Sequence, residues 1–318
     1  MRRHLCGDKE NGRALLNGVL DVFLQNILPI FLVAGLGFWL RRGLKLSVKP
    51  LSSVVFNAFS PCLVFSALVG SQLPAGELTD LALFALLSIL FMALVAWLAG
   101  RILRFSRVKT VTLMIVVMFV NGGNFGLTLN QLRYGEAGLS RAVVYFVVST
   151  ALVYTVGVFI ASAGRLSLRD ALRRLARIPP LYAVVLALLV YGFQVTVPAP
   201  LMSAIDIAAA GAIPVMIVIL GMQLADLRDF SALRFAGLAA FLRLIVAPVA
   251  AVGLAALIGL QGLNRSTAII EASMPTAVIT TVIATEFELS GPVVTSVVAI
   301  TTILSPLTLS LVIQLLGL

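Results

Sequence analysis

Residues 120–129 read VNGGNFGLTL, which places two asparagines and three glycines inside an otherwise apolar run. Glycine costs about 1 kcal/mol relative to alanine in a helix interior, and asparagine side chains compete for nearby backbone hydrogen bonds. This stretch therefore predicts an interruption in a helix, and the sequence around it indicates what kind of helix that is.

The composition is typical of an integral membrane protein. Of the 318 residues, 60% are hydrophobic and only 11% are charged, with a mean hydropathy of +1.10. A soluble domain needs more charge to cover its surface. Apolar runs long enough to cross a hydrocarbon core of about 30 Å recur along the chain, and they are continuous rather than alternating. We therefore expect an all-α membrane protein rather than a β-barrel.

The apolar runs, divided at loop signals, predict ten transmembrane helices. A polar N-terminal tail (1–19) would precede a first five-helix repeat (20–163), a cytoplasmic linker (164–178) and a second five-helix repeat (179–318). The expected spans are 20–40, 48–69, 79–100, 110–132, 139–163, 179–197, 201–224, 233–259, 265–285 and 292–316.

Most of the Lys and Arg residues lie in the loops after the first, third, fifth and seventh expected helices. Basic loops stay in the cytoplasm, so both termini should lie on the other side of a bacterial inner membrane. The net charge of +10 is then a topology signal, and we expect no nucleic-acid partner. The Cys and His residues have no metal-site spacing, and we expect neither a metal nor another cofactor.

The two halves share faint internal similarity at an offset of 153 residues, which relates Pro61 to Pro214, Gly122 to Pro275 and Gly138 to Gly291. The alternative is that three such matches arise by chance. Five helices per half would insert in opposite orientations. Inverted repeats with interrupted helices in matching places indicate a secondary transporter and its binding site.

The counterpart of the first interruption is EASMPTAV at 271–278, where Pro275 breaks the helix. The two broken helices are expected to cross in the middle of the membrane. Backbone exposed at that depth is tolerated only under protein or beside a water-filled cavity. The N-termini of half-helices carry partial positive charge and free N–H groups, so this point suits an anion.

The chain resembles the auxin efflux carrier family, in its bacterial branch of malonate and other organic-acid permeases. The similarity covers essentially the whole chain after the tail. The most specific segments are NGGNFGLTL (121–129), EASMPTAVITTVIATEFEL (271–289) and TTILSPLTLSL (301–311).

The resemblance implies two inverted five-helix repeats with broken, crossing helices 4 and 9 and substrate bound beside the crossing. Helices 1, 2, 6 and 7 would form a scaffold that dimerises, and helices 3–5 and 8–10 a mobile transport domain. Plant carriers have prolines where this chain has Val120 and Thr128. We therefore expect a small organic anion, rather than auxin, as substrate.

The expected substrate-binding residues come from both interruptions. The amides of Asn121 and Asn124, which would share one face if helical, either bind a carboxylate or tie the helix to a neighbour. Ser273 and Thr276 either contact substrate or cap the backbone freed by Pro275. The full set is Asn121, Gly122, Gly123, Asn124, Gly126, Ser273, Pro275 and Thr276.

Four further residues are candidates for ion coupling or for lining the cavity. Glu271 is an acidic residue inside a span, so it either couples transport to protons or faces an outer vestibule. Arg243 attracts the anion, extends to the cytoplasmic headgroups or forms a structural pair. Tyr145 and Asn57 either line the space between scaffold and transport domain or form structural hydrogen bonds.

Together these observations predict a secondary active transporter of small organic anions that works by elevator-type alternating access. Proton or Na⁺ coupling, or the membrane potential, would drive it. One alternative is a sodium-coupled symporter of the bile-acid-transporter-like type, and another is a non-transporting membrane sensor or channel. The spans lack the paired acids, His clusters or serine motif of a membrane enzyme, so we expect no enzyme.

Overall fold

The computed structural model describes residues 16–71, 73–162, 169–170, 173, 176–226 and 233–318. Within them the chain forms helices and no strand, apart from an isolated antiparallel bridge between Val120 and Thr276. In the same residues seven helices are long and apolar enough to cross a membrane: Leu16–Gly43, Val48–Gly70, Ala75–Ile102, Gly122–Ala161, Ala199–Asp226, Leu233–Ile258 and Gly291–Leu316. The prediction of an all-α, multi-pass membrane protein is confirmed at this level.

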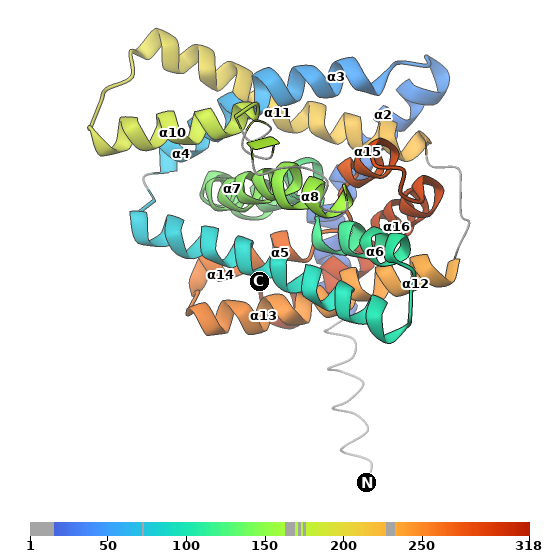
Figure 1. Ribbon diagram of the computed structural model, residues 1–318. Helices are drawn as coiled ribbons and strands as arrows, with labels where there is room; N and C mark the ends of the chain where they lie inside the picture. Colours follow the sequence, from blue (N-terminus) through green and yellow to red (C-terminus); the bar gives the residue numbers. More distant parts are fainter. Residues whose placement is uncertain (1–15, 72, 163–168, 171–172, 174–175, 227–232) are drawn as a thin grey trace, which may run out of the picture.

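The helices are arranged in two layers (Figure 1). The first layer lies along the top of that view and contains the first helices of each half of the chain. Its members are α2 (Leu28–Gly43), α3 (Val48–Val54), α4 (Ser60–Ser71), α10 (Pro179–Gly192) and α11 (Ala199–Asp226).

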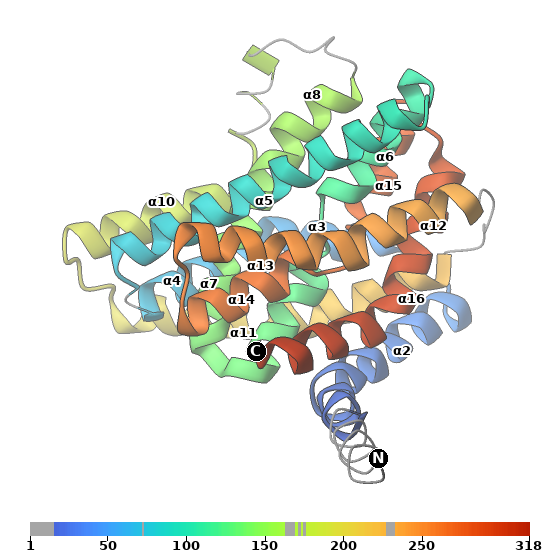
Figure 2. The ribbon, with the colours of Figure 1, turned by 90° about the horizontal axis from the view of Figure 1, so that it is seen from below.

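The second layer contains the remaining helices of both halves, and α5, α12, α13 and α14 face the viewer when the molecule is seen from below (Figure 2). Its members are α5 (Ala75–Ile102), α6 (Arg107–Met118), α7 (Leu127–Leu152), α8 (Val158–Ala161), α12 (Leu233–Phe241), α13 (Ala247–Ile258), α14 (Gly262–Ala272), α15 (Ile279–Glu286) and α16 (Gly291–Leu316).

The first layer is held together where α2 crosses α11 with their backbones in contact. A Cβ added at Gly37 would collide with the backbone of Val218, and one added at Gly221 would collide with the backbone of Ala34. Small residues allow such close approach between membrane helices, where van der Waals packing replaces the hydrophobic effect as the main source of association.

Five π-helical segments occur within the described helices, and a π-turn widens a helix and often lies at a functional site. One covers the glycine-rich stretch Gly122–Gly126, and another contains Arg243. They are η1 (Phe23–Ile27), η2 (Val55–Phe59), η3 (Gly122–Gly126), η4 (Val153–Gly157) and η5 (Leu242–Val246).

Both expected interruptions are present. Helix α6 ends at Met118, and the backbone is non-helical until η3 begins at Gly122. Helix α14 ends at Ala272, and α15 begins only at Ile279. Pro275 accounts for the second break because it lacks an N–H and clashes with the preceding turn.

Several predicted boundaries are wrong. The first helix begins by Leu16 rather than at residue 20, because the apolar pattern extends upstream. The expected break between spans 110–132 and 139–163 is present but shorter than predicted: two helices within α7 meet at Gly135, whose non-helical φ of 63° and ψ of −153° only glycine adopts readily. Helix α10 has 14 residues instead of a full span. Residues 1–15 of the expected tail and most of the linker lie outside the described residues.

Candidate functional site

The two interruptions meet and pair through their backbones. The N–H of Asn121 donates to the carbonyl of Pro275 at 2.8 Å, and the N–H of Ala277 donates to the carbonyl of Phe119 at 3.0 Å. These bonds form the isolated bridge between Val120 and Thr276. Unpaired backbone is costly inside a bilayer, so this short extended pairing is what allows both helices to break there.

Arg243 lies between the C-terminal ends of the two half-helices that lead into the breaks. Its guanidinium donates to the carbonyl of Val117 in α6 at 2.8 Å and to the carbonyl of Ala272 in α14. A cation suits these ends because the helix dipole makes them partially negative. The side chain is 2% exposed and its Nε–H has no partner. Of the alternatives for Arg243, extension to the headgroups does not fit this buried position.

Glu271, in the last turn of α14, has a completely buried carboxyl group. Its Oε1 accepts a hydrogen bond from Nδ2 of Asn130 at 3.0 Å, and Nδ2 also donates to the carbonyl of Gly126 at 3.0 Å. Its Oε2 has no partner. No ion pair of Glu271 or Arg243 occurs within the described residues. The carboxyl group therefore does not face an open outer vestibule in this conformation.

The glycines of η3 make room for that carboxyl group. A Cβ added at Gly122 would lie 2.7 Å from Oε2 of Glu271, and one at Gly126 would lie 2.6 Å from its Cδ. A Cβ at Gly123 would lie 2.9 Å from the ring of Phe146. These positions therefore exclude side chains for steric reasons.

The two asparagines of the glycine-rich stretch have different surroundings. Asn121 is buried in the non-helical segment, with φ −78° and ψ 55°, so the expected shared helical face does not exist. Its Nδ2 has no hydrogen-bond partner. Asn124 is half-buried, and its Nδ2 donates to Oε1 of Gln223 in α11 at 3.4 Å. Asn121 thus retains a free donor, while Asn124 links the two layers.

The polar residues of the second interruption bond to backbone carbonyls of α6 and α14. The hydroxyl of Thr276 donates to the carbonyl of Val116 at 2.8 Å, and its N–H donates to the hydroxyl of Thr301 at 3.2 Å. The hydroxyl of Ser273 donates to the carbonyl of Ile269 at 2.6 Å. In this conformation both side chains cap backbone, which was one of the two alternatives.

The remaining two candidates differ in position: Tyr145 lies close enough to Arg243 and Glu271 to interact with both electrostatically, whereas Asn57 lies on η2. Tyr145 is buried in the second layer, where its hydroxyl lies 3.2 Å from that of Ser88 and its ring packs on Phe84. Asn57 is exposed on η2 and donates to the carbonyl of Ser53 at 2.8 Å. Both make structural hydrogen bonds in this conformation.

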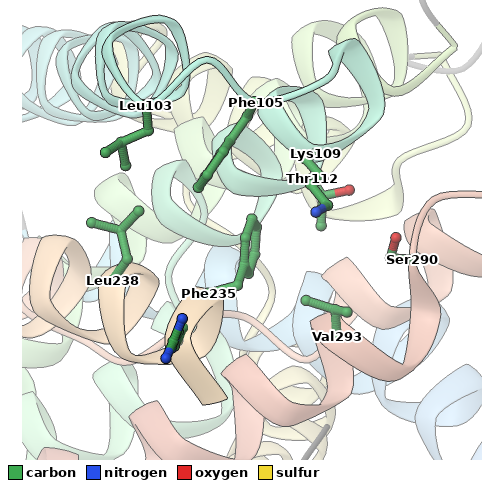
Figure 3. Close-up of a pocket in the computed structure, with 9 residues that line it drawn as sticks. Leu103, Phe105, Lys109, Thr112, Phe235, Leu238, Ser290 and Val293 are labelled. Carbon is green, nitrogen blue, oxygen red and sulfur yellow. The ribbon is translucent and has the colours of Figure 1, made fainter. Parts of the chain in front are cut away.

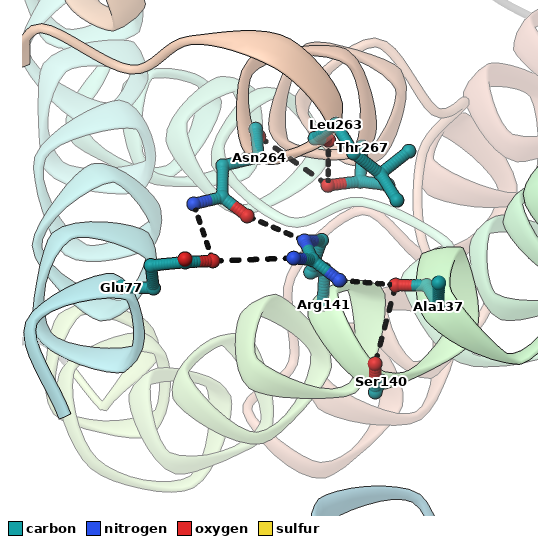
Figure 4. Close-up of polar contacts among 7 residues, drawn as sticks. All are labelled: Glu77, Ala137, Ser140, Arg141, Leu263, Asn264 and Thr267. Atoms are coloured by element: carbon teal, nitrogen blue, oxygen red, sulfur yellow. Dashed lines mark hydrogen bonds and ion pairs between the residues drawn. The ribbon is translucent and has the colours of Figure 1, made fainter. Parts of the chain in front are cut away.

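A polar cluster joins three helices at one end of the second layer (Figure 4). Arg141 of α7 forms an ion pair with Glu77 of α5 at 3.2 Å and also donates to Oδ1 of Asn264. Asn264, at the start of α14, donates in turn to Glu77 at 2.9 Å. The cluster joins the start of α14, the helix that carries Glu271, to α5 and α7.

Three polar residues were missed by sequence reasoning. Asn130 and Gln223 become relevant only through contacts with Glu271 and Asn124, which are distant in sequence. Asp206 is an exposed acid inside α11 that accepts a hydrogen bond from Ser66 at 2.6 Å. Because Asp206 lies within the expected span 201–224, the sequence alone could have marked it as a candidate functional residue.

The meeting point therefore gathers a buried cation, an amide with a free donor and a carboxyl group with a free oxygen, all within protein. Such a set suits binding of small charged groups.

Comparisons with known proteins agree with this description. Residues 22–313 match the family described as Membrane transport protein, which is auxin efflux carrier-like. A relative named uncharacterized transporter, from Methanothermobacter thermautotrophicus, is 27% identical over 90% of this chain and 96% of its own length. The uncharacterized transporter MJ1031 of Methanocaldococcus jannaschii is 27% identical over 83% of this chain and 88% of its own. The chain belongs to this auxin efflux carrier-like family, and it is a membrane transporter rather than an enzyme.

Proposed function

We propose that this transporter is a secondary active carrier of small organic anions, with its substrate site where the two interrupted helices meet. The observation that carries the proposal is the unpartnered Nδ2 of Asn121 on the paired, non-helical backbone. A buried amide donor normally has a partner, so its absence here suits a ligand that supplies one.

An anion suits this point for electrostatic reasons. The fully buried guanidinium of Arg243 has no carboxylate partner among the described side chains, so its charge is balanced only by carbonyl dipoles. Helix α7 and η3 run away from the break and direct their N-terminal N–H groups towards it. A carboxylate bound there would accept from Asn121 and lie in the field of Arg243.

We further propose that ten spans form two inverted five-helix repeats, with three spans represented here by interrupted or short helices. The first layer would be the scaffold, through which a homodimer forms, and the second layer would be the transport domain. The domain would slide against the scaffold in an elevator-type cycle. This division follows the two layers of Figure 1.

Glu271 is the proposed coupling residue. A buried carboxyl group with no cationic partner is expensive to ionise, so it would exchange a proton or receive a cation during the cycle. The free Oε2 of Glu271 and the free Oδ1 of Asn130 are oxygen ligands of the kind that a dehydrated Na⁺ takes, as the sodium-coupled symporter alternative requires. Uptake measured with the proton gradient and the Na⁺ gradient in opposite directions distinguishes proton coupling from Na⁺ coupling.

Uptake of radiolabelled malonate into proteoliposomes tests the function. We expect saturable uptake driven by a gradient, and a reduction of tenfold or more in the Asn121→Ala variant. The Asn17→Ala variant is the matched control, because Asn17 is an exposed amide at the start of the first helix.

Uptake equal in both variants would refute the site. If no small carboxylate accumulates against its gradient, the carrier function itself fails. Sustained ion current, much faster than a carrier cycles, would support the channel alternative, and ligand binding without flux would support a sensor.

A further inference from the structure

A cavity of about 470 Å³ lies in the second layer, separate from the meeting point of the interruptions (Figure 3). Its walls come from the end of α5, the start of α6, the start of α12 and the region where α16 begins. The lining residues are Leu103, Phe105, Lys109, Thr112, Arg234, Phe235, Leu238, Ser290 and Val293.

The lining combines two chemistries. Phe105 and Phe235 pack with ring centroids 5.8 Å apart, and with Leu238 and Val293 they make most of the wall apolar. Lys109 on α6 and Arg234 on α12 add two positive charges, and Ser290 adds a hydroxyl group. Among the described residues no acidic side chain lines the cavity, so their charge is complementary to an anion attached to an apolar body.

The position of the cavity indicates where such a ligand comes from. The α5–α6 turn and the start of α12 lie at one end of the molecule, on the side away from α4 and α10 (Figures 1 and 2). That end carries the basic loops that predict the cytoplasmic face. With that topology, a cavity there would meet the headgroup region of the inner leaflet, where basic residues attract anionic lipids.

We propose that this cavity binds one anionic phospholipid. Its phosphate would lie between Lys109, Arg234 and Ser290, and the upper part of its acyl chains would pack on Phe105 and Phe235 while the rest stays in the bilayer. A volume of about 470 Å³ accommodates a phosphate with its glycerol backbone. The cavity is lined by residues at the ends of α5, α6, α12 and α16, so a bound lipid would hold these four helices together at one end of the second layer.

The experiment measures lipid binding to the full-length protein by native mass spectrometry and by thermal shift in neutral detergent. We expect one retained phosphatidylglycerol per chain and a rise in the melting temperature with added phosphatidylglycerol. The double variant Lys109→Gln/Arg234→Gln should bind about thirty-fold more weakly, from about 1 kcal/mol per basic residue near an anionic surface.

The matched control is Arg42→Gln/Lys49→Gln, which removes the same charge from exposed positions at the same end, outside the cavity. It should bind phosphatidylglycerol like the wild type. Equal loss in both double variants would overturn the proposal, because the effect would then be general surface charge.

Three other ligands test the identity of the occupant. Phosphatidylcholine should stabilise the protein much less than phosphatidylglycerol, because it has no net negative charge. Inorganic phosphate or malonate that stabilised the wild type as strongly, and failed to do so in the cavity variant, would show a site for soluble anions and overturn the lipid assignment. This readout does not depend on transport, so it is separable from the proposed carrier function.

Discussion

At the scale of single residues, the glycines of η3 and the carboxyl group of Glu271 form one steric unit. Gly126 carries no side chain because the Glu271 carboxyl group fills the space where a Cβ would lie. The sequence predicted that these glycines shape the backbone, but it could not show that they accommodate a particular side chain 145 positions away.

Gly126→Ala should therefore destabilise the protein by about 1–3 kcal/mol, because overpacking a buried contact forces neighbouring groups to move. Thermal unfolding in detergent measures this. Gly253→Ala is the control, since a Cβ there meets nothing within 4 Å. A helical glycine in open space should gain stability on change to alanine. Equal melting temperatures in the two variants would refute the steric account.

Glu271→Gln tests the coupling role at the same scale. Glutamine keeps the shape and an oxygen that accepts from Asn130, but it cannot ionise. We expect normal folding and exchange of malonate, with loss of the acceleration that a proton or Na⁺ gradient gives the wild type. The control is Glu136→Gln, at an exposed position. Gradient-driven uptake that survives in Glu271→Gln would exclude Glu271 as the coupling residue.

At the scale of elements, Arg243 holds the two half-helices together. It connects the carbonyls of Val117 and Ala272, which no helical N–H reaches because both helices end there. The sequence places Arg243 inside a span, where it could contact the lipid headgroups, attract the anionic substrate or form a structural pair. Its bonds to two helix ends could not be predicted, because Val117 and Ala272 are distant from Arg243 in the sequence and only the packing of the helices brings them together.

Replacing Arg243 by methionine should leave both carbonyls unsatisfied, at about 1–3 kcal/mol each. Hydrogen exchange at residues 117–124 and 272–278 should rise together, and the melting temperature should fall. Arg243→Lys keeps the charge and should lose less. Arg42→Met, at an exposed arginine, should change neither region. Exchange that rises on only one helix would contradict a shared cap.

At the scale of the whole molecule, helix type and most spans could be predicted from the sequence because long apolar runs leave few alternatives. Boundaries were less predictable. The region near Gly135 contains Arg133, Tyr134 and Glu136, which indicate a loop, yet a single glycine at positive φ is enough to separate the two helices of α7. The hydrogen-bond partners of Glu271, Arg243 and Asn124 could not be predicted from the sequence, because they are set by the packing of helices that are distant along the chain.

The two-layer arrangement makes a prediction about movement. Asn124 in the second layer bonds to Gln223 in the first, so a sliding domain must break this contact in each cycle. In a variant whose own cysteines are replaced, cross-linking Asn124→Cys to Gln223→Cys with a short bis-methanethiosulfonate, which forms a disulfide with each thiol, should stop malonate uptake. Reduction of those disulfides should return uptake to the level of the double variant before cross-linking.

The control cross-link joins Glu77→Cys to Asn264→Cys, a pair within the second layer that is bonded in the wild type at 2.9 Å. It should leave uptake in place, because both positions move together. Continued transport by the inter-layer cross-linked protein would rule out sliding of one layer against the other.

The central claim is that a small organic anion binds where the two interrupted helices meet. An experimental density map of the purified protein with saturating malonate tests it most directly. The account predicts ligand density between residues 121–124 and 273–276, within hydrogen-bond distance of Asn121 Nδ2. Density for malonate at any other place, or unbroken helical density through residues 118–122 and 272–279, would contradict it.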